Sequence, residues 1–143
     1  MISNKCYYGL RAMLELAIHE GDGPITIGDI AAARNIPVRF LEAILRQLKQ
    51  AGLADSARGK EGGYQLARPA QRIQVGEVIR LFEGPLLAVS AQLEDTEPGT
   101  DVFAEVWQQG ESALNQTLDH ISFATLAERE RALDAAESSN YTI

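Results

Sequence analysis

The sequence predicts a mainly α-helical protein that contains one small β-hairpin. Three observations support this fold class. Amphipathic stretches with helical spacing fill most of residues 1–85. A glycine-rich stretch with alternating apolar residues interrupts them. A longer amphipathic stretch follows an acidic, turn-like segment. Three helices, a hairpin and a further helix in this order form a winged helix-turn-helix. We therefore expect such a domain, followed by a long C-terminal dimerisation helix.

Charge and composition divide the chain into four expected parts: a winged-helix DNA-binding domain (1–85), an acidic linker loop (86–101), the dimerisation helix with a final helix (102–135) and a flexible tail (136–143). Residues 1–85 carry 11 Lys and Arg against 9 Asp and Glu, whereas residues 86–143 carry 2 against 11, so net charges of +2 and -9 give the total of -7. Because nucleic-acid binding depends on local charge, this acidic total does not exclude it.

The first three predicted helices have clear boundary signals. An apolar stripe at helical spacing indicates a first helix that Gly21 ends. Thr26 is a suitable N-cap for a short second helix, and Pro37 suits the first turn of a third helix, which Gly52 ends. The short link between the second and third helices is typical of a helix-turn-helix.

The third helix separates an apolar stripe from a polar outer face. The stripe consists of Leu41, Ile44, Leu45 and Leu48. In a winged helix-turn-helix this helix enters the major groove, where Arg39 would reach guanine edges and Glu42 would accept a hydrogen bond from cytosine. Arg46 and Lys49 lie further along the helix and are better placed for phosphates.

The predicted hairpin pairs residues 53–57 with residues 64–67 around a cationic loop. The loop carries Arg58 and Lys60 together with Gly59, Gly62 and Gly63. Glycines let the main chain approach phosphates closely, and an arginine side chain inserts into a narrow minor groove. Another amphipathic helix follows and stops at Gly84-Pro85.

The long helix, expected at about residues 102–121, carries large apolar side chains. We assign these to a dimer interface or to core packing: Val106, Trp107, Leu114, Leu118 and Ile121. The acidic stretch from Glu94 to Asp101 reads as a solvated linker rather than a cation site.

Several classes of function are disfavoured by the sequence. A single cysteine, Cys6, excludes an internal disulfide and a metal site built from several cysteines of one chain. No signal peptide, membrane anchor or nucleophile–base pattern is recognisable, so we expect a cytoplasmic protein that is not an enzyme. Cys6 is expected to be a small, half-buried helix residue, with a redox-sensing thiol as the alternative.

Four segments carry a family resemblance: "NKCYYGLRAMLELA", "FLEAILRQLKQAGL", "ARGKEGGYQLAR" and "VGEVIRLFEGP". Together they resemble the Rrf family of bacterial winged-helix repressors. The resemblance implies a homodimer with crossing C-terminal helices, bound to palindromic double-stranded DNA. It implies base readout by Glu42 and Arg39, a minor-groove Arg58, and Lys5 and Tyr8 near the DNA backbone. Arg39 replaces a residue that is often small and polar in this family. The expected DNA-binding set also includes Thr26, Arg46, Lys49, Gly59, Lys60, Gly63 and Tyr64.

The sequence departs from the cluster-binding members of that family. Those members carry three cysteines in the loop before the long helix, where this chain reads "SAQLEDTEPGTDV". Tyr7 stands where one group of relatives has an aspartate ligand. Iron–sulfur clusters need soft thiolate ligands, so we expect no iron–sulfur cluster and no metal site.

The final residues "NYTI" resemble isoleucine tails that plug the active site of cysteine synthase (O-acetylserine sulfhydrylase). The cluster-free, cysteine-metabolism members of the family have a comparable ending. Tyr141, Thr142 and Ile143 are therefore an expected partner-binding tail, and sulfur or cysteine metabolism is the expected target of regulation. Two alternatives stay open: a regulator that senses an oxidant through Cys6 or an unknown small molecule, and a winged-helix scaffold that binds protein but not DNA.

Overall fold

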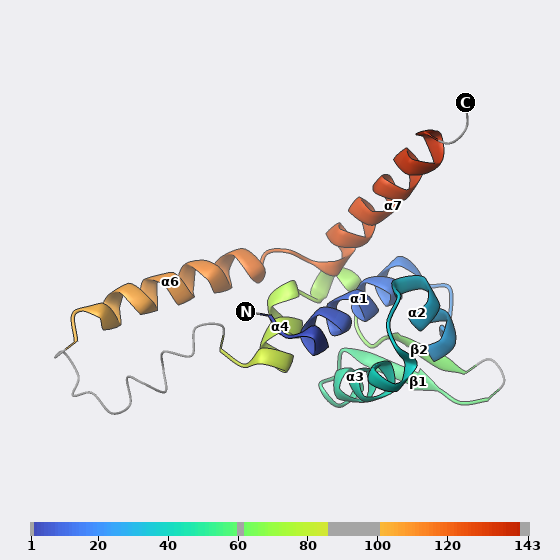
Figure 1. Ribbon diagram of the computed structural model, residues 1–143, viewed down its shortest axis with the longest axis horizontal. Coiled ribbons are helices and arrows are strands. Elements are labelled where there is room, and N and C mark those ends of the chain that lie inside the picture. The colour runs from blue at the N-terminus through green and yellow to red at the C-terminus, as the bar shows by residue number, and fades with distance from the viewer. Residues whose placement is uncertain (1, 60–61, 86–100, 141–143) are drawn as a thin grey trace.

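The computed structural model describes residues 2–59, 62–85 and 101–140. Lys60, residues 86–100 of the expected linker, and the tail residues Tyr141, Thr142 and Ile143 lie outside the described residues. The elements are α1 (Asn4–Ile18), α2 (Ile27–Arg34), α3 (Val38–Gln50), β1 (Ala54–Ala57), β2 (Gly63–Leu66), the 3₁₀ turn η1 (Ala70–Arg72), α4 (Val75–Glu83), α6 (Phe103–Leu118) and α7 (Phe123–Asn140) (Figure 1). The predicted winged helix-turn-helix is confirmed. Within the described ranges, no helix is long and apolar enough to cross a membrane.

Helix α1 lies at the centre of the body and contacts α2, α3, α4 and α7. Its Met13 and Leu16 are fully buried together with the predicted apolar stripe of α3, namely Leu41, Ile44, Leu45 and Leu48. Gly9 lets α4 approach closely, since a Cβ atom at this position would lie 2.4 Å from the Phe82 ring. The core therefore forms around α1.

Local backbone signals fix the helix-turn-helix. The Thr26 hydroxyl accepts a hydrogen bond from the Asp29 N–H at 3.1 Å, which confirms Thr26 as the N-cap of α2. Asn35 ends α2 in the left-handed conformation (φ 52°), and the buried Ile36 joins the turn to the core. At the other end of α3, Gly52 has φ 76°, and the N–H groups of Gly52 and Leu53 bond back to the carbonyls of Lys49 and Leu48.

The wing is an antiparallel pair in which Ala54 faces Leu66 and Ala57 faces Gly63. The outer edge of β2 is paired as well, because Ile25 and Tyr64 exchange two backbone N–H···O bonds of 2.8 Å. Gly63 permits this approach, since a Cβ atom there would lie 2.2 Å from the Ile25 carbonyl oxygen. The wing is thus attached to the segment that precedes α2.

The last helix differs from the sequence-based division of the chain. Helix α7 packs on α1, and its Phe123 and Ala127 are buried in the core of the winged-helix body. The helix also continues through residues 136–140, which the sequence analysis assigned to a flexible tail. The docking of α7 on the body has a tertiary cause: Arg34 of α2 joins the buried Glu15 of α1, at 2.5 Å, to Glu130 of α7, at 2.9 Å.

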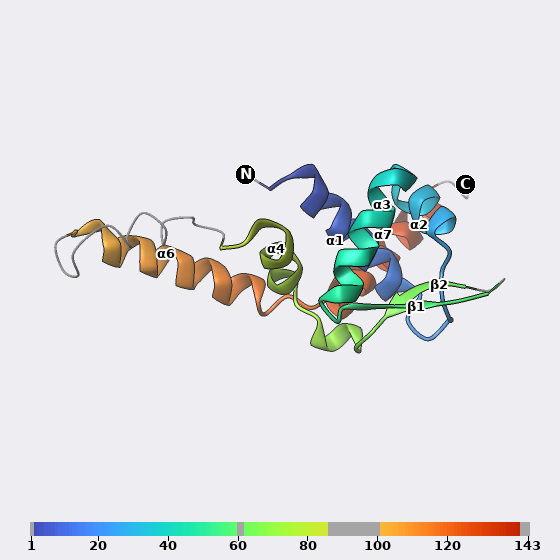
Figure 2. The same cartoon turned by 90° about the horizontal axis from the view of Figure 1, so that it is seen from below.

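Helix α6 has no buried residue and projects from the body in both views (Figures 1 and 2). Its C-terminal end is anchored by Arg80, which donates to the Asp119 carboxylate at 2.6 Å and to the Asn115 side chain at 3.3 Å. The Val75 N–H donates to the Ile121 carbonyl at 2.9 Å. These contacts fix the base of α6 on α4.

Replacing Gly63 with alanine tests the attachment of the wing. We expect Gly63→Ala to lower the free energy of unfolding by about 1–3 kcal/mol, because the added methyl group overlaps the Ile25 carbonyl. The matched control is Gly28→Ala in α2, where the nearest atom lies 4.0 Å from the new Cβ and stability should stay equal or rise by up to about 1 kcal/mol. Urea unfolding measures both; equal stabilities for the two variants would contradict this packing.

Candidate nucleic-acid interface

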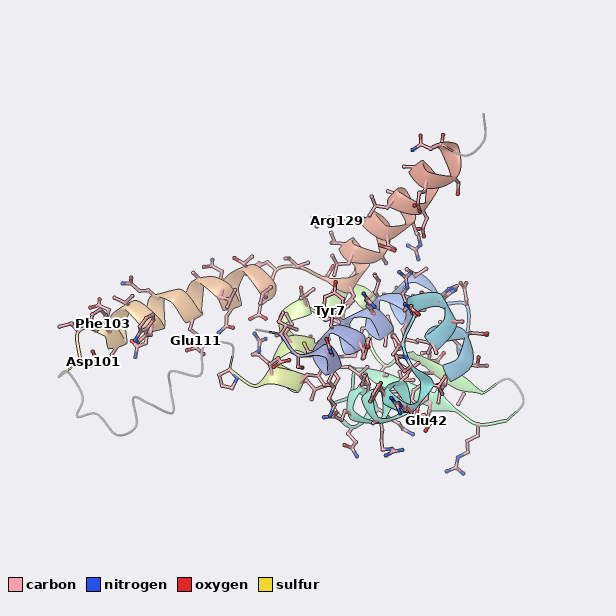
Figure 3. All side chains as sticks on the ribbon, viewed as in Figure 1. Tyr7, Glu42, Asp101, Phe103, Glu111 and Arg129 are labelled. Carbon is pink, nitrogen blue, oxygen red and sulfur yellow. The ribbon has the colours of Figure 1, made fainter. Side chains whose placement is uncertain are left out.

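The outer face of α3 presents the side chains that the sequence analysis selected. Arg39, Glu42, Arg46 and Lys49 are all exposed, while the apolar stripe of α3 is buried. Figure 3 shows Glu42 on the side of the molecule away from α7 and its Arg129. Since the core holds one side of α3, its polar side is free to enter a DNA groove.

The wing extends beside α3 (Figure 2). Arg58 is exposed at the end of β1, and the following Gly59 has φ 108°, a conformation that strains any residue with a side chain. The ammonium group of Lys49 donates a hydrogen bond to the Ser56 hydroxyl at 2.6 Å. Lys49 therefore also links α3 to β1, a contact that the sequence did not predict.

An aromatic stack joins α1 to the first turn of α3. The rings of Tyr8 and Phe40 are stacked with centroids 6.2 Å apart, and the Arg39 guanidinium lies 4.7 Å from the centroid of the Phe40 ring. Phe40 was missed by the sequence analysis, although it interrupts the polar face as a large apolar residue outside the buried stripe. Lys5 lies on the same edge of α1 and is exposed.

Some cations of the described residues form ion pairs, and others are exposed without one. Arg34, Arg68 and Arg80 form ion pairs with Glu15, Glu77 and Asp119, at N–O distances of 2.5, 3.0 and 2.6 Å. Among the described residues, no ion pair includes the cations of α3, the wing or the α1 edge, which are Lys5, Arg39, Arg46, Lys49 and Arg58. Arg11, Arg72, Arg129 and Arg131 have no ion pair among the described residues either. What distinguishes the α3 and wing side is that the exposed cations Arg39, Arg46, Lys49 and Arg58 lie on α3 and at the end of β1, which pack against each other.

Three of the predicted DNA-binding residues have a structural role in the described part of the chain. The Thr26 hydroxyl caps α2, Gly63 makes room for Ile25, and Tyr64 is partly buried against the core. These roles position α2 and the wing, and none of them excludes an additional contact to DNA.

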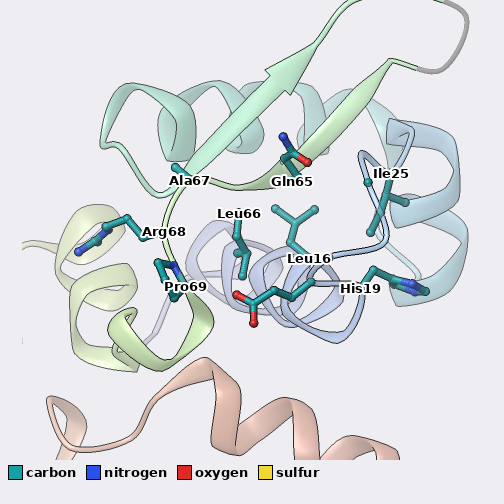
Figure 4. Close-up of a pocket in the computed structure, with 11 residues that line it drawn as sticks. Leu16, His19, Ile25, Gln65, Leu66, Ala67, Arg68 and Pro69 are labelled. Atoms are coloured by element: carbon teal, nitrogen blue, oxygen red, sulfur yellow. The ribbon is translucent and has the colours of Figure 1, made fainter.

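A separate cavity of about 260 Å³ lies at the base of the wing (Figure 4). Its apolar lining includes Leu16, Ile25 and Leu66. Three of the polar side chains around it are already engaged: His19 contacts Glu15 at 3.0 Å, Arg68 pairs with Glu77 at 3.0 Å, and Glu20 accepts a hydrogen bond from the Ala70 N–H at 2.7 Å. We therefore place the candidate site on α3 and the wing.

A helix-turn-helix with an exposed cationic third helix and an adjacent cationic wing defines a class: winged-helix DNA-binding regulators. Comparison with known sequences agrees with this class. Residues 2–129 match the sequence profile of the Rrf2 family, described as an iron-dependent transcriptional regulator. The chain belongs to the Rrf2 family of transcriptional regulators.

Individual relatives cover nearly the whole chain. The transcriptional regulator CymR of Bacillus subtilis (strain 168) is 39% identical over 126 residues, which are 88% of this chain and 88% of that protein. Its solved structure, described as the global cysteine regulator of B. subtilis, is 38% identical with a TM-score of 0.78, covering 90% of this chain and 97% of that one. The solved IscR of T. potens is 34% identical with a TM-score of 0.76, covering 91% and 88%.

The residues of this chain do not fit an iron–sulfur cluster, although the family description names iron. The whole sequence has one cysteine, and Cys6 is 0% exposed inside α1. Burial, together with the nearby Glu83 carboxylate, raises the pKa of the Cys6 thiol to about 11, so the thiol stays protonated at neutral pH. Within the described ranges, no group of three or more His, Cys, Asp or Glu side chains is arranged to hold a metal ion.

The burial of Cys6 predicts that its thiol reacts slowly with reagents in solution. In native protein at pH 8 we expect Cys6 to react with a disulfide reagent such as DTNB at least about tenfold more slowly than an exposed thiol, because only the thiolate attacks and the Cys6 side chain is fully buried. A Cys6→Ser/Gln108→Cys double variant supplies the exposed reference thiol on α6.

The pH dependence of stability has a defined sign. Because the folded-state pKa lies above the ordinary 9.0, the contribution of Cys6 to stability is complete below pH 9 and is lost as the pH rises toward 11.

In the test with the disulfide reagent, reaction of native Cys6 at the rate of the reference thiol would contradict the burial of Cys6 and would favour a role for Cys6 as a redox sensor.

Proposed function

We propose that the chain is a homodimeric, sequence-specific repressor that binds palindromic DNA and works without an iron–sulfur cluster. The observation that carries this proposal is the cationic outer face of α3 beside the wing: Arg39, Arg46, Lys49 and Arg58 are exposed, and no ion pair of the described residues includes them. A nucleic-acid backbone supplies the missing negative charge.

Each predicted contact has a distinct role in this proposal. Glu42 accepts a hydrogen bond from a cytosine amino group in the major groove, and Arg46 and Lys49 contact phosphates. Arg58, together with Lys60, reaches the minor groove at the wing. The exposure of the described members of this set supports these roles, as does the position of Glu42 on the side away from α7 (Figure 3).

The exposed apolar side chains of helix α6 favour the proposed homodimer. Its exposed large apolar side chains include Val106 and Trp107, at 52% and 42% exposure, and Leu114. Phe103 adds to this face and stacks on Trp107 with ring centroids 6.4 Å apart. Leu118 and Ile121, at the base of the helix, are partly covered. A second copy of α6 would bury this apolar face, and a two-fold dimer matches a palindromic operator.

We further propose that the chain controls cysteine metabolism. This proposal rests on the likeness to CymR, whose structure is described as a global cysteine regulator, and on the tail sequence ending in Tyr141, Thr142 and Ile143. We propose that cysteine synthase binds this tail and changes DNA affinity. Such a partner shifts the equilibrium only if it binds the DNA-competent state more tightly than the other state.

Binding to DNA is tested with a fragment of the promoter of the protein's own gene. We expect a gel shift whose affinity falls steeply with salt, and Arg58→Ala should weaken it by about 10- to 100-fold. Arg129→Ala removes an exposed cation of α7, on the side away from Glu42, and should leave the shift unchanged. Absence of a shift, or a salt-independent one, would favour a protein-binding scaffold instead.

The tail is tested by deleting Ile143 and measuring binding to cysteine synthase by calorimetry. We expect the deletion to abolish binding, because the proposed pocket recognises one apolar side chain next to a carboxylate. O-acetylserine should compete with the intact tail. An unchanged affinity after the deletion would end the cysteine-synthase part of the proposal and leave the DNA-binding part standing.

A further inference from the structure

A groove of about 420 Å³ lies between the N-terminal end of α1 and the first turns of α3. It is lined by Asn4, Lys5, Tyr8, Arg39, Phe40, Ala43 and Ile44. Two cations and one amide thus meet apolar and aromatic walls, and no carboxylate belongs to the lining. This charge balance suits an anion.

The position of Arg39 in this groove follows from the aromatic stack. Its guanidinium lies over Phe40, whose ring is 45% exposed and stacks nearly parallel on Tyr8, with an interplanar angle of 17°. Tyr8 belongs to α1, so the stack holds the Arg39 side chain on the α1 edge of α3. Stacking on an aromatic face leaves the N–H edges of a guanidinium free to donate hydrogen bonds.

This arrangement differs from what base readout requires. An arginine that reads guanine extends from the recognition helix toward the base edges, with two N–H groups aligned on one base. Arg39 instead lines the same groove as Lys5, a residue of a different helix. Two cations that converge from two helices recognise charge rather than a pattern of donors and acceptors.

We infer that Lys5 and Arg39 clamp one phosphate of the DNA backbone at the α1 edge, with Phe40 and Tyr8 as the platform that positions Arg39. This inference rests on the proposed DNA binding and reassigns Arg39 from base readout to phosphate binding. Glu42 is then the base-reading side chain in the first turns of α3. Because the platform orders the guanidinium before DNA arrives, less side-chain freedom is lost on binding.

The test uses a duplex that wild-type protein selects from a pool with a randomised centre. Each phosphate of this duplex is replaced in turn by an uncharged methylphosphonate. Wild type should lose about tenfold in affinity at one phosphate per half-site, the loss of a charge-assisted hydrogen bond. Lys5→Gln and Arg39→Gln should both be insensitive to that replacement.

Salt dependence and base preference separate the two roles of Arg39. Arg39→Gln should reduce the slope of log affinity against log salt by about 0.9 per protomer and leave the selected base sequence unchanged. Phe40→Leu should reproduce this effect in part, whereas Phe40→Tyr, which keeps the ring, should match wild type. Arg129→Gln on α7 is the charge control and should change neither quantity. Thermal melting checks that each variant is folded.

Three results would overturn the phosphate clamp or the proposed DNA binding, and each result differs from the others. If Arg39→Gln changes the preferred base at one position while keeping its sensitivity to every methylphosphonate, Arg39 reads a base and the clamp is wrong. If Lys5→Gln and Arg39→Gln respond to different phosphates, the two side chains do not share one anion and the clamp is also wrong. If wild type selects no duplex at all, the proposed DNA binding itself is wrong.

Discussion

Helix α1 contacts α2, α3, α4 and α7, and the position of each functional surface depends on this packing. One side of α1 receives the apolar stripe of α3, which leaves the polar face of α3 outward. Gly9 admits the Phe82 ring of α4, whose Arg80 in turn fixes the base of α6. The buried Glu15 binds Arg34 and thereby joins α2 and α7 to the same helix. Lys5 and Tyr8, which form one wall of the groove between α1 and α3, belong to this helix as well.

The same packing explains how a protein of net charge -7 presents a cationic face. Burial lowers the pKa of Arg34, but hydrogen bonds and charge from Glu15 and Glu130 outweigh this effect and raise the pKa above its ordinary value. Acidic side chains of the body thus neutralise inward arginines, and much of the remaining acid belongs to residues 86–143. The cations of α3 and the wing stay exposed and can therefore interact with an anionic partner.

The sequence was informative wherever a feature is local. Thr26 and Gly52 predicted helix ends, the alternation around Gly63 predicted the wing, and the stripe beginning at Leu41 predicted which side of α3 is buried. The sequence did not predict features that depend on contacts between residues far apart in the chain. Phe123 of α7 is buried in the core, and Arg34 meets Glu130 across 96 residues, so the packing of α7 was not predictable from its own pattern. The Tyr8–Phe40 stack is also a contact between two helices.

We propose that the exposed apolar face of α6 pairs two copies of the chain into the DNA-binding unit. The most direct test of this pairing is the solution mass and DNA affinity of Val106→Glu, a change on a helix without buried residues that should leave each copy folded. We expect a wild-type mass of twice 15.6 kDa, and a Val106→Glu monomer that binds the palindrome at least about tenfold more weakly. A wild-type monomer of 15.6 kDa, or a monomeric variant with undiminished affinity, would contradict it.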